Sequence, residues 1–283
     1  SMRPGNMPDA RNMTNAFLPG AFQGTYVDPT NTKIEDIIKN IKSEFASVRD
    51  QREQLDLLLK LNNVHKGKRQ DGDDLEARIK SFELAYRMQT DAREAFDVSL
   101  EKPETITKYG DNPQGRQMLI ARRLLERDVR FVQVWQGGWD LHNGIAQRAK
   151  RNADQLDPAI GAIVDDLKER GLFEDTLIYI TSEFGRSVTE DGGGGRSHNA
   201  RALSTVLLGG GIKGGIAYGE TDELGGAAVK DKAHVKDIHA TVLDLLGFDH
   251  EQLTFNTAGR DFRLTQATNS LPQGGTPIKG IMS

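Results

Sequence analysis

The chain has 283 residues, with 37 Lys and Arg against 41 Asp and Glu, so its net charge is −4. This length can bury the core of one large α/β domain or of two small ones. The acidic balance argues against a generic binder of nucleic acid or of an anionic membrane surface, since such proteins are basic. Cysteine is absent, which excludes a disulfide scaffold, an iron–sulfur cluster and a thiol nucleophile. No stretch approaches the roughly 18 apolar residues of a membrane helix, so we expect no membrane insertion.

The first part of the chain is expected to be irregular and then helical. Residues 1–33 show no periodicity and predict an extended N-terminal segment. Residues 34–127 predict a helical segment packed on the core, because apolar residues recur there at three- and four-residue spacing. Residues 103–113 are expected to form a loop before a short helix over 116–127. The apolar stripes are Ile34, Ile37, Ile38, Ile41, Phe45 and Val48, then Leu55, Leu58, Leu59 and Val64, then Leu75, Ile79, Phe82 and Tyr86.

Residues 128–265 change character and alternate β-rich runs with helical stripes. Strands are predicted over 129–135, 177–181 and 204–208. One helix is predicted to begin no later than Pro158, which Asp157 can cap, and to be ended by Gly171. Another carries an apolar stripe from Val235 to Leu246 and is stopped by Gly247. Strands separated by helices predict a three-layer α/β/α core with a mostly parallel sheet. Residues 266–283 are left as a C-terminal tail.

Three polar clusters follow predicted strands, where open α/β sheets gather their ligands. Asp140 and His142 come just after the first strand and are two residues apart, so on extended backbone both side chains point the same way. A carboxylate and an imidazole that converge are natural ligands of a divalent metal ion. The alternative is a solvated aspartate beside a hydrogen-bonded histidine in an ordinary loop.

The second cluster, Ser182 to Arg186, follows the strand that ends at Thr181. Glu183 can ligate a metal or act as a base, and the planar guanidinium of Arg186 can hold an anionic oxygen pair. A simple surface ion pair is the alternative, because such pairs are common.

The third cluster follows the Gly192–Gly195 run, where glycines allow the backbone to approach a ligand closely. It supplies His198 as a third candidate metal ligand and Arg196 as a second anion binder. The alternative is a mobile loop that happens to contain a histidine, and taken alone this cluster is a weak signal.

Taken together and in order, these segments resemble a known group of proteins. The series is GGWDLHN, TSEFGR, GRSHN, VLLGGGIKGG, AYGETDELG, HVKDIHATVLDLLG and GRDFRLT, preceded by FLPGAFQGT and RMQT. It resembles an uncharacterised bacterial sulfatase-like family of the alkaline phosphatase superfamily. The resemblance implies an alkaline-phosphatase-like fold and a site of one or two divalent metals that acts on phosphate, sulfate or phosphonate esters. It also implies that the chain matches the C-terminal two-thirds of a family member, that the nucleophile region lies upstream, and that family members are often exported.

The resemblance implies a role for each candidate residue. Asp140 and His142 match the first Asp/His pair of metal ligands, and His198 matches the final histidine. Glu183 stands where the aspartate of a second pair would be, as a ligand or as an acid/base, while Phe184 replaces the histidine of that pair. Ser197 replaces an aspartate of the relatives, which removes a carboxylate. No nucleophile is nominated, although Ser182 and Ser197 lie near the motifs.

The function expected from these residues is a metal-dependent hydrolase of phosphate or sulfate esters. Asp140, His142, His198 and Glu183 would hold the metal, and Arg186 and Arg196 would hold a small anionic ester. Zinc is favoured as the metal, with manganese, calcium and magnesium as alternatives. The alternative is a non-catalytic or truncated module that keeps the fold and covers an exposed sheet edge, for instance by forming a homo-oligomer.

Overall fold

The computed structural model describes residues 24–28, 30–31, 34–37, 47–66, 83, 86, 93–257, 259–266 and 274–283. The chain divides into two compact units. One comprises Ser1–Asp140 and Arg151–Asp165, and the other comprises Leu141–Lys150 and Asp166–Ser283. Several predicted apolar positions lie outside the described residues, namely Ile38, Ile41, Phe45, Leu75, Ile79 and Phe82, as do RMQT and most of FLPGAFQGT.

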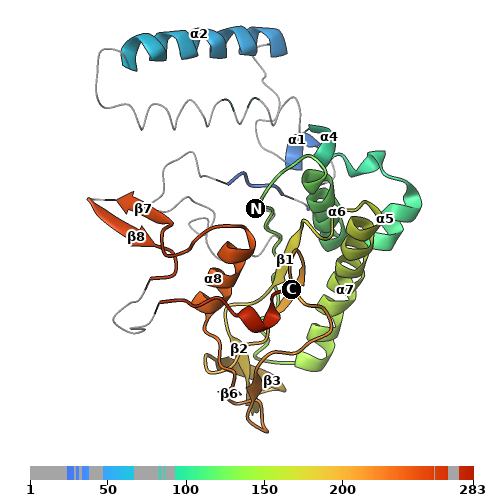
Figure 1. Cartoon of the computed structure of the whole chain (residues 1–283). Helices are drawn as coiled ribbons and strands as arrows, with labels where there is room; N and C mark the ends of the chain where they lie inside the picture. The colour runs from blue at the N-terminus through green and yellow to red at the C-terminus, as the bar shows by residue number, and fades with distance from the viewer. Residues whose placement is uncertain are drawn as a thin grey trace. The chain divides into compact units, whose positions relative to one another are not determined.

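The described part of the first unit is helical, as Figure 1 shows. Its helices before residue 140 are α1 (Ile34–Ile37), α2 (Val48–Lys66), α4 (Arg93–Phe96), the 3₁₀ turn η3 (Val98–Leu100), α5 (Pro103–Tyr109) and α6 (Pro113–Leu125). Helix α6 contacts α4, α5 and η3. Phe96, Tyr109, Leu119 and Ile120 are fully buried and form the core of this packing.

Residues 103–113 contain helix α5, so the loop predicted there is wrong. Pro103 occupies the first turn of α5, where its fixed φ suits a helix and its missing N–H costs no hydrogen bond. Gly110, at φ 90°, ends α5, and the Asn112 side chain then caps α6 by accepting hydrogen bonds from the backbone N–H groups of Gln114 and Gly115. Pro103 and Pro113 each start a helix, and prolines in this position are easily mistaken for loop residues.

A buried charge cluster joins α6 to the segment before α5. Arg122 lies 2.8 Å from Glu101 and 2.8 Å from Glu126, and Arg123 also pairs with Glu101. Arg123 Nε donates a hydrogen bond to the carbonyl of Ala95 at 3.2 Å. These contacts place two guanidinium groups inside the unit with carboxylate partners, as a buried charge requires.

Among the described residues, the strands lie in the second unit and pair as four antiparallel two-stranded sheets. The pairs are β1 (Leu177–Ile180) with β4 (Val206–Gly209), β2 (Gly185–Asp191) with β3 (Gly195–Asn199), β5 (Glu220–Thr221) with β6 (Ala228–Lys230), and β7 (Thr254–Thr257) with β8 (Arg260–Arg263). No parallel sheet occurs among the described residues. The predicted three-layer α/β/α fold with a mostly parallel, alkaline-phosphatase-like sheet is therefore wrong.

The connections explain the antiparallel pairing. Two of the predicted strands exist as β1 and β4, but the chain between them forms the β2–β3 hairpin and contains no helix. A parallel pair needs a crossover, usually a helix, whereas an antiparallel partner can be reached by simple return of the chain. Leu177 accordingly pairs with Gly209 and Ile180 with Val206.

The predicted strand over 129–135 is also wrong. Of these residues only Val134 makes a β-bridge, and Phe131 is 81% exposed. A β-prone run becomes a strand only when a neighbouring strand pairs its backbone groups. The following helix, α7 (Ile145–Glu169), begins well before Asp157, so Pro158 lies inside it and does not start it.

Helix α8 (Val235–Leu245) has the bounds that its apolar stripe predicts, and Gly247 follows it at φ 79°. His234 and Asp237 form a capping box at its start. Ile238 packs in a core with Ile278 and with Ile281 of the 3₁₀ turn η4 (Lys279–Ile281), against Tyr179 of β1 and Leu207 of β4. Figure 1 shows α8 beside β1 in this unit. Within the described residues, no helix combines the length and apolar character needed to cross a membrane.

Candidate metal centre

The β2–β3 hairpin is the scaffold of the candidate site. Asp191 and Gly195 are paired across the end of the hairpin, so Gly192, Gly193 and Gly194 form its turn. Gly193 and Gly194 adopt φ values of 83° and 78°, a left-handed conformation that favours glycine. The glycine run that the sequence offers is thus a tight hairpin turn, as the turn chemistry requires.

The segment that carries His142 is hydrogen-bonded to this turn. The backbone N–H groups of Gly144 and Ile145 donate to the carbonyls of Gly193 and Gly194 at 2.9 and 3.1 Å, and Arg196 N–H donates to the carbonyl of Leu141 at 2.9 Å. A Cβ atom on Gly195 would lie 1.9 Å from the carbonyl carbon of His142. Gly195 therefore lets the two backbones meet, and this contact brings His142 to the hairpin.

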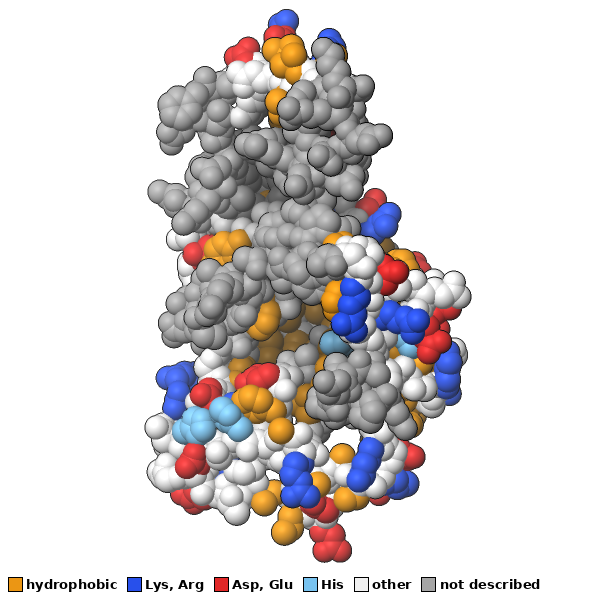
Figure 2. Space-filling model, turned by 90° about the vertical axis from the view of Figure 1, so that its left-hand side faces the viewer, with side chains coloured by type: hydrophobic (Ala, Val, Ile, Leu, Met, Phe, Trp, Pro, Cys, Tyr) orange, Lys and Arg blue, Asp and Glu red, His pale blue; other side chains and the backbone are white. Residues whose placement is uncertain are grey.

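Three predicted ligands come together at this place. Asp140, His142 and His198 each offer one ligand atom, and these atoms all lie within 4.8 Å of one another. His142 Nε2 lies 3.2 Å from His198 Nε2. Asp140 and His198 are exposed and His142 is partly exposed; Figure 2 shows histidine side chains at the surface with acidic side chains near them. The cluster is therefore open to ions in solution.

The spacing of the two imidazole nitrogens fits a shared metal ion. Two ligands bound tetrahedrally at a zinc–nitrogen distance of about 2.0–2.1 Å lie about 3.3 Å apart, and the observed separation is 3.2 Å. Three protein ligands leave a fourth tetrahedral position for water or substrate, an arrangement typical of catalytic zinc sites. The described residues thus contain a possible Asp–His–His metal-binding triad, as the sequence predicted.

Asp191 contacts the candidate site, although the sequence did not single it out. Its Oδ2 lies 2.7 Å from Nδ1 of His142, and its Oδ1 accepts a hydrogen bond from the backbone N–H of Gly192 at 3.1 Å. The hydrogen bond from His142 lowers the pKa of the Asp191 carboxyl, helped by the Gly192 N–H and by the nearby histidines. A carboxylate behind a ligating histidine is a common feature of metal sites. Its only sequence signal is its place just before the glycine turn.

Glu183 stands apart from the other predicted ligands. It is exposed and does not belong to the group of ligand atoms formed by Asp140, His142 and His198. It precedes β2, and the next residue, Phe184, places its ring 4.2 Å from the ring of His198. The aromatic residue, and not the acid, thus contacts the candidate metal ligand.

The two predicted anion binders occupy the same hairpin as His198. Arg186 lies directly opposite His198 in the strand register, and its guanidinium carbon is 5.4 Å from the centre of the Phe184 ring. Arg196 precedes His198 by two residues on β3, and its Nη1 donates to the carbonyl of Gly195 at 2.7 Å. Both arginines therefore stand close in the fold to the candidate ligand.

The serines near the motifs differ in their contacts. Ser182 Oγ donates to the carbonyl of Phe184 at 3.0 Å. Ser197 is exposed, and its backbone N–H donates to Ser187 Oγ at 3.1 Å. Neither arrangement pairs a serine hydroxyl with a base, which an activated nucleophile requires.

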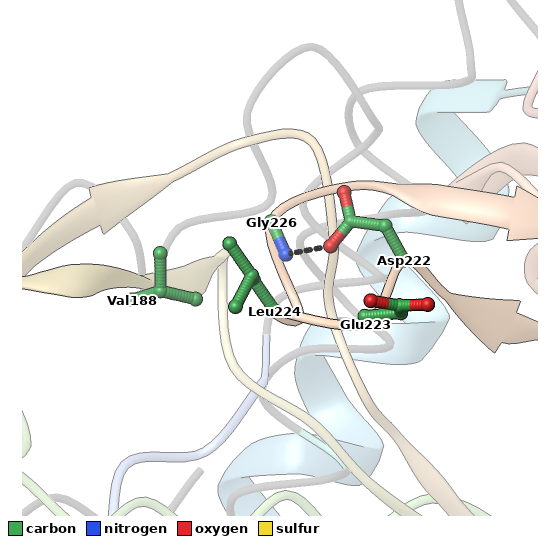
Figure 3. Close-up of a pocket in the computed structure, with 5 residues that line it drawn as sticks. All are labelled: Val188, Asp222, Glu223, Leu224 and Gly226. Carbon is green, nitrogen blue, oxygen red and sulfur yellow. Dashed lines mark hydrogen bonds between the residues drawn. The ribbon is translucent and has the colours of Figure 1, made fainter.

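A separate hollow of about 390 Å³ lies on the same unit (Figure 3). It is lined by Val188, Asp222, Glu223, Leu224 and Gly226. Asp222 Oδ1 accepts the backbone N–H of Gly226 at 2.6 Å, so this carboxylate holds its own turn together. None of the three candidate metal ligands lines the hollow.

Comparison with known proteins gives the family. The family model described as "Protein of unknown function (DUF1501)" matches residues 3–273, so the chain belongs to that family. No curated protein and no solved structure matches the chain. The family is distinct from the sulfatases and alkaline phosphatases, and no family of either kind matches. The resemblance to a sulfatase-like family of the alkaline phosphatase superfamily is therefore wrong, and any role of a residue must come from its own geometry.

Proposed function

We propose that Asp140, His142 and His198 bind one divalent metal ion, and that zinc is that ion. The observation that carries the proposal is the 3.2 Å separation of the two Nε2 atoms, which suits two ligands of one tetrahedral ion. Two imidazoles with one carboxylate favour zinc over calcium and magnesium, which prefer oxygen ligands. Manganese is the remaining competitor.

We further propose that this centre hydrolyses small phosphate or sulfate esters. A divalent ion with an open position would act as a Lewis acid on an oxygen of the ester. Arg186 and Arg196, from the same hairpin, supply fixed positive charge for the remaining anionic oxygens. Because the chain has a net charge of −4, these two guanidinium groups are not part of a generally basic protein.

The metal proposal is tested by measuring bound zinc and manganese in protein purified without chelator, and by calorimetric titration of the chelated protein. We expect about one equivalent of zinc, bound more tightly than manganese, with a large loss of affinity in His142→Ala and His198→Ala. Glu183→Gln is the matched control, because Glu183 lies outside the ligand group. Unchanged zinc binding in both histidine variants would overturn the proposal.

The hydrolase proposal is tested on the zinc-loaded chain with aryl phosphate and aryl sulfate esters. We expect turnover that is lost in His198→Ala, and a raised KM in Arg186→Gln if that guanidinium binds the anionic group. Zinc binding without turnover of either ester would contradict hydrolysis and favour a non-catalytic metal-binding module. Such a module would also use exposed ligands, and two of the three candidate ligands are exposed.

A further inference from the structure

The two ring nitrogens of His142 have different partners. Nδ1 faces Asp191 Oδ2 at 2.7 Å, and Nε2 faces His198 Nε2 at 3.2 Å. An ionised carboxylate can only accept a hydrogen bond, so Nδ1 must carry the proton. In the neutral imidazole this leaves Nε2 without a proton, and its lone pair is available to an ion. Only a nitrogen in that state can bind a metal ion.

Asp191 is itself held in a fixed orientation. Oδ1 accepts the backbone N–H of Gly192 at 3.1 Å, which leaves Oδ2 for His142. The backbone of Asp191 is paired with Gly195, the residue on which the His142 backbone rests. The carboxylate and the imidazole are thus brought together by the same end of the hairpin.

His198 must behave differently from His142. While both rings are neutral and His142 Nε2 carries no proton, the hydrogen bond between the two Nε2 atoms has His198 Nε2 as its donor. His198 can bind an ion through Nε2 only after that proton has left and Nδ1 has taken one up. The total number of protons on the neutral ring is unchanged by this exchange of tautomers.

We infer that Asp191 is a positioning residue that holds His142 as its Nδ1–H tautomer and so presents Nε2 to the metal, while His198 is the ligand that changes tautomer when the ion binds. This inference deepens the proposed metal centre and rests on it. Asp191 touches no substrate and no ion; it acts through the imidazole of His142.

The decisive variant is Asp191→Asn. The Gly192 N–H already occupies the position of Oδ1, so the amide oxygen is held there and the NH₂ group faces His142. The amide then donates to Nδ1, which forces the proton of His142 to Nε2 and blocks the ligand atom. Loss of an orienting partner of this kind lowers metal affinity by about 10- to 100-fold. Asp191→Ala provides a second variant, which removes the partner without imposing the wrong tautomer.

The matched control is Glu190→Gln. Glu190 is the neighbouring residue in the same hairpin, and its Oε1 accepts the backbone N–H of Gly194 at 2.8 Å. The substitution removes the same charge from the same turn without touching His142. We expect its zinc affinity to stay within about twofold of the native value.

The experiment measures imidazole ¹⁵N chemical shifts by NMR on the full chain without metal, and zinc affinity on the same samples. We expect Nδ1–H for His142 in the native chain and in Glu190→Gln, and Nε2–H in Asp191→Asn. His250, whose Nδ1 contacts Thr265 Oγ1 at 2.8 Å, serves as the reference for correct folding. A merely structural role of Asp191 would not change which nitrogen is protonated.

The outcomes separate this inference from the proposed function. If His142 keeps Nδ1–H in both Asp191 variants while zinc affinity is unchanged, the positioning role is overturned and the metal centre stands. If the native chain binds no zinc, the proposed centre fails, and the tautomer of His142 in the metal-free chain still decides whether Asp191 orients it. A His198 that keeps Nε2–H after zinc has bound would overturn the tautomer change.

Discussion

At the scale of single residues, carboxylates decide how histidine and arginine side chains are used. Asp191 Oδ2 lies 2.7 Å from Nδ1 of His142, and Glu101 pairs with the guanidinium groups of Arg122 and Arg123 in the first unit. The side chains of Arg122 and Arg123 are only 3% and 8% exposed. A buried cation without its partner is strongly destabilising. Arg122 also pairs with Glu126, so Glu101 matters most for Arg123.

The first prediction concerns Glu101→Gln. The amide keeps the shape of the carboxyl group but loses its charge, and Arg123 then has no ionised side chain beside it among the contacts described above. We expect the free energy of unfolding to fall by about 3 kcal/mol, measured by urea denaturation followed by far-UV circular dichroism. Glu174→Gln, at an exposed position before β1, is the control and should change stability by less than about 0.5 kcal/mol. Equal stability of the two variants would contradict the role of Glu101.

The second prediction is the pH dependence of the same group. Burial alone would raise the pKa of Glu101, but hydrogen bonds from Arg123 and Arg122 and their charges outweigh it and lower the pKa below its usual value of 4.5. The unfolded chain therefore binds the proton more readily than the folded chain. The stability that Glu101 contributes is complete above pH 4.5 and is lost as the pH falls through the lower folded pKa.

Urea denaturation at a series of pH values checks this directly. The difference in unfolding free energy between the native chain and Glu101→Gln should be constant near neutral pH. It should shrink as the pH falls below 4.5, because a protonated Glu101 resembles glutamine. A difference that stayed constant down to pH 3 would show that Glu101 has no lowered pKa.

At the scale of elements, the β2–β3 hairpin positions the candidate site because residues 141–145 pack against it. Residues 141–145 form backbone hydrogen bonds with the glycine turn and with Arg196, and this contact sets the distance between His142 and His198. The separation of two ligand nitrogens thus depends on a backbone-to-backbone approach, which only a residue without a Cβ allows at position 195.

The third prediction compares two glycines of the same hairpin, Gly192 in its turn and Gly195 at the start of β3. In Gly195→Ala the new Cβ would lie 1.9 Å from the His142 carbonyl carbon, so the segment must move away from the hairpin. We expect zinc affinity to fall at least about 10-fold, since a ligand must be held within a few tenths of an ångström. In Gly192→Ala the Cβ meets nothing within 4 Å, and zinc affinity should stay native. Calorimetric titration of both variants decides between them, and equal affinities would contradict the dependence on this contact.

The sequence predicted the members of the candidate site better than it predicted the fold. Asp140, His142 and His198 could be named because their chemistry is local and each follows a glycine-rich or β-prone run. The pairing of β1 with β4 could not be predicted from propensity, because antiparallel and parallel partners use the same residues and differ only in the connection. Asp191 was missed for a related reason: its role arises from the register of a hairpin, and a carboxylate beside glycines looks like any turn residue.

At the scale of the whole molecule, the two candidate histidine ligands and the buried charge cluster are expected to respond to different perturbations. His142, His198 and Asp191 belong to the second unit, whereas Glu101, Arg122 and Arg123 belong to the first. A ligand that binds the folded state stabilises only those openings that release it. Zinc therefore distinguishes motions that break the candidate centre from motions that leave it intact.

The fourth prediction follows from that distinction and uses hydrogen exchange. The amides of Gly144, Ile145 and Arg196 are hydrogen-bonded across the contact between residues 141–145 and the hairpin. Their exchange requires that contact to open, and opening separates His142 from His198. At a free zinc concentration of about 100 times Kd, the linkage amounts to about 2.7 kcal/mol, so we expect their exchange to slow by up to about 100-fold.

The amide of Arg116, which donates to Asn112 at the start of α6, is the internal reference. Its local opening leaves His142 and His198 together, so zinc should not change its exchange rate. His198→Ala should abolish the protection at Gly144, Ile145 and Arg196 while leaving Arg116 as it is. If zinc slowed exchange equally at Arg116 and at the three amides of the hairpin contact, the prediction would be wrong. All four amides would then exchange only through global unfolding, which zinc opposes equally at every position.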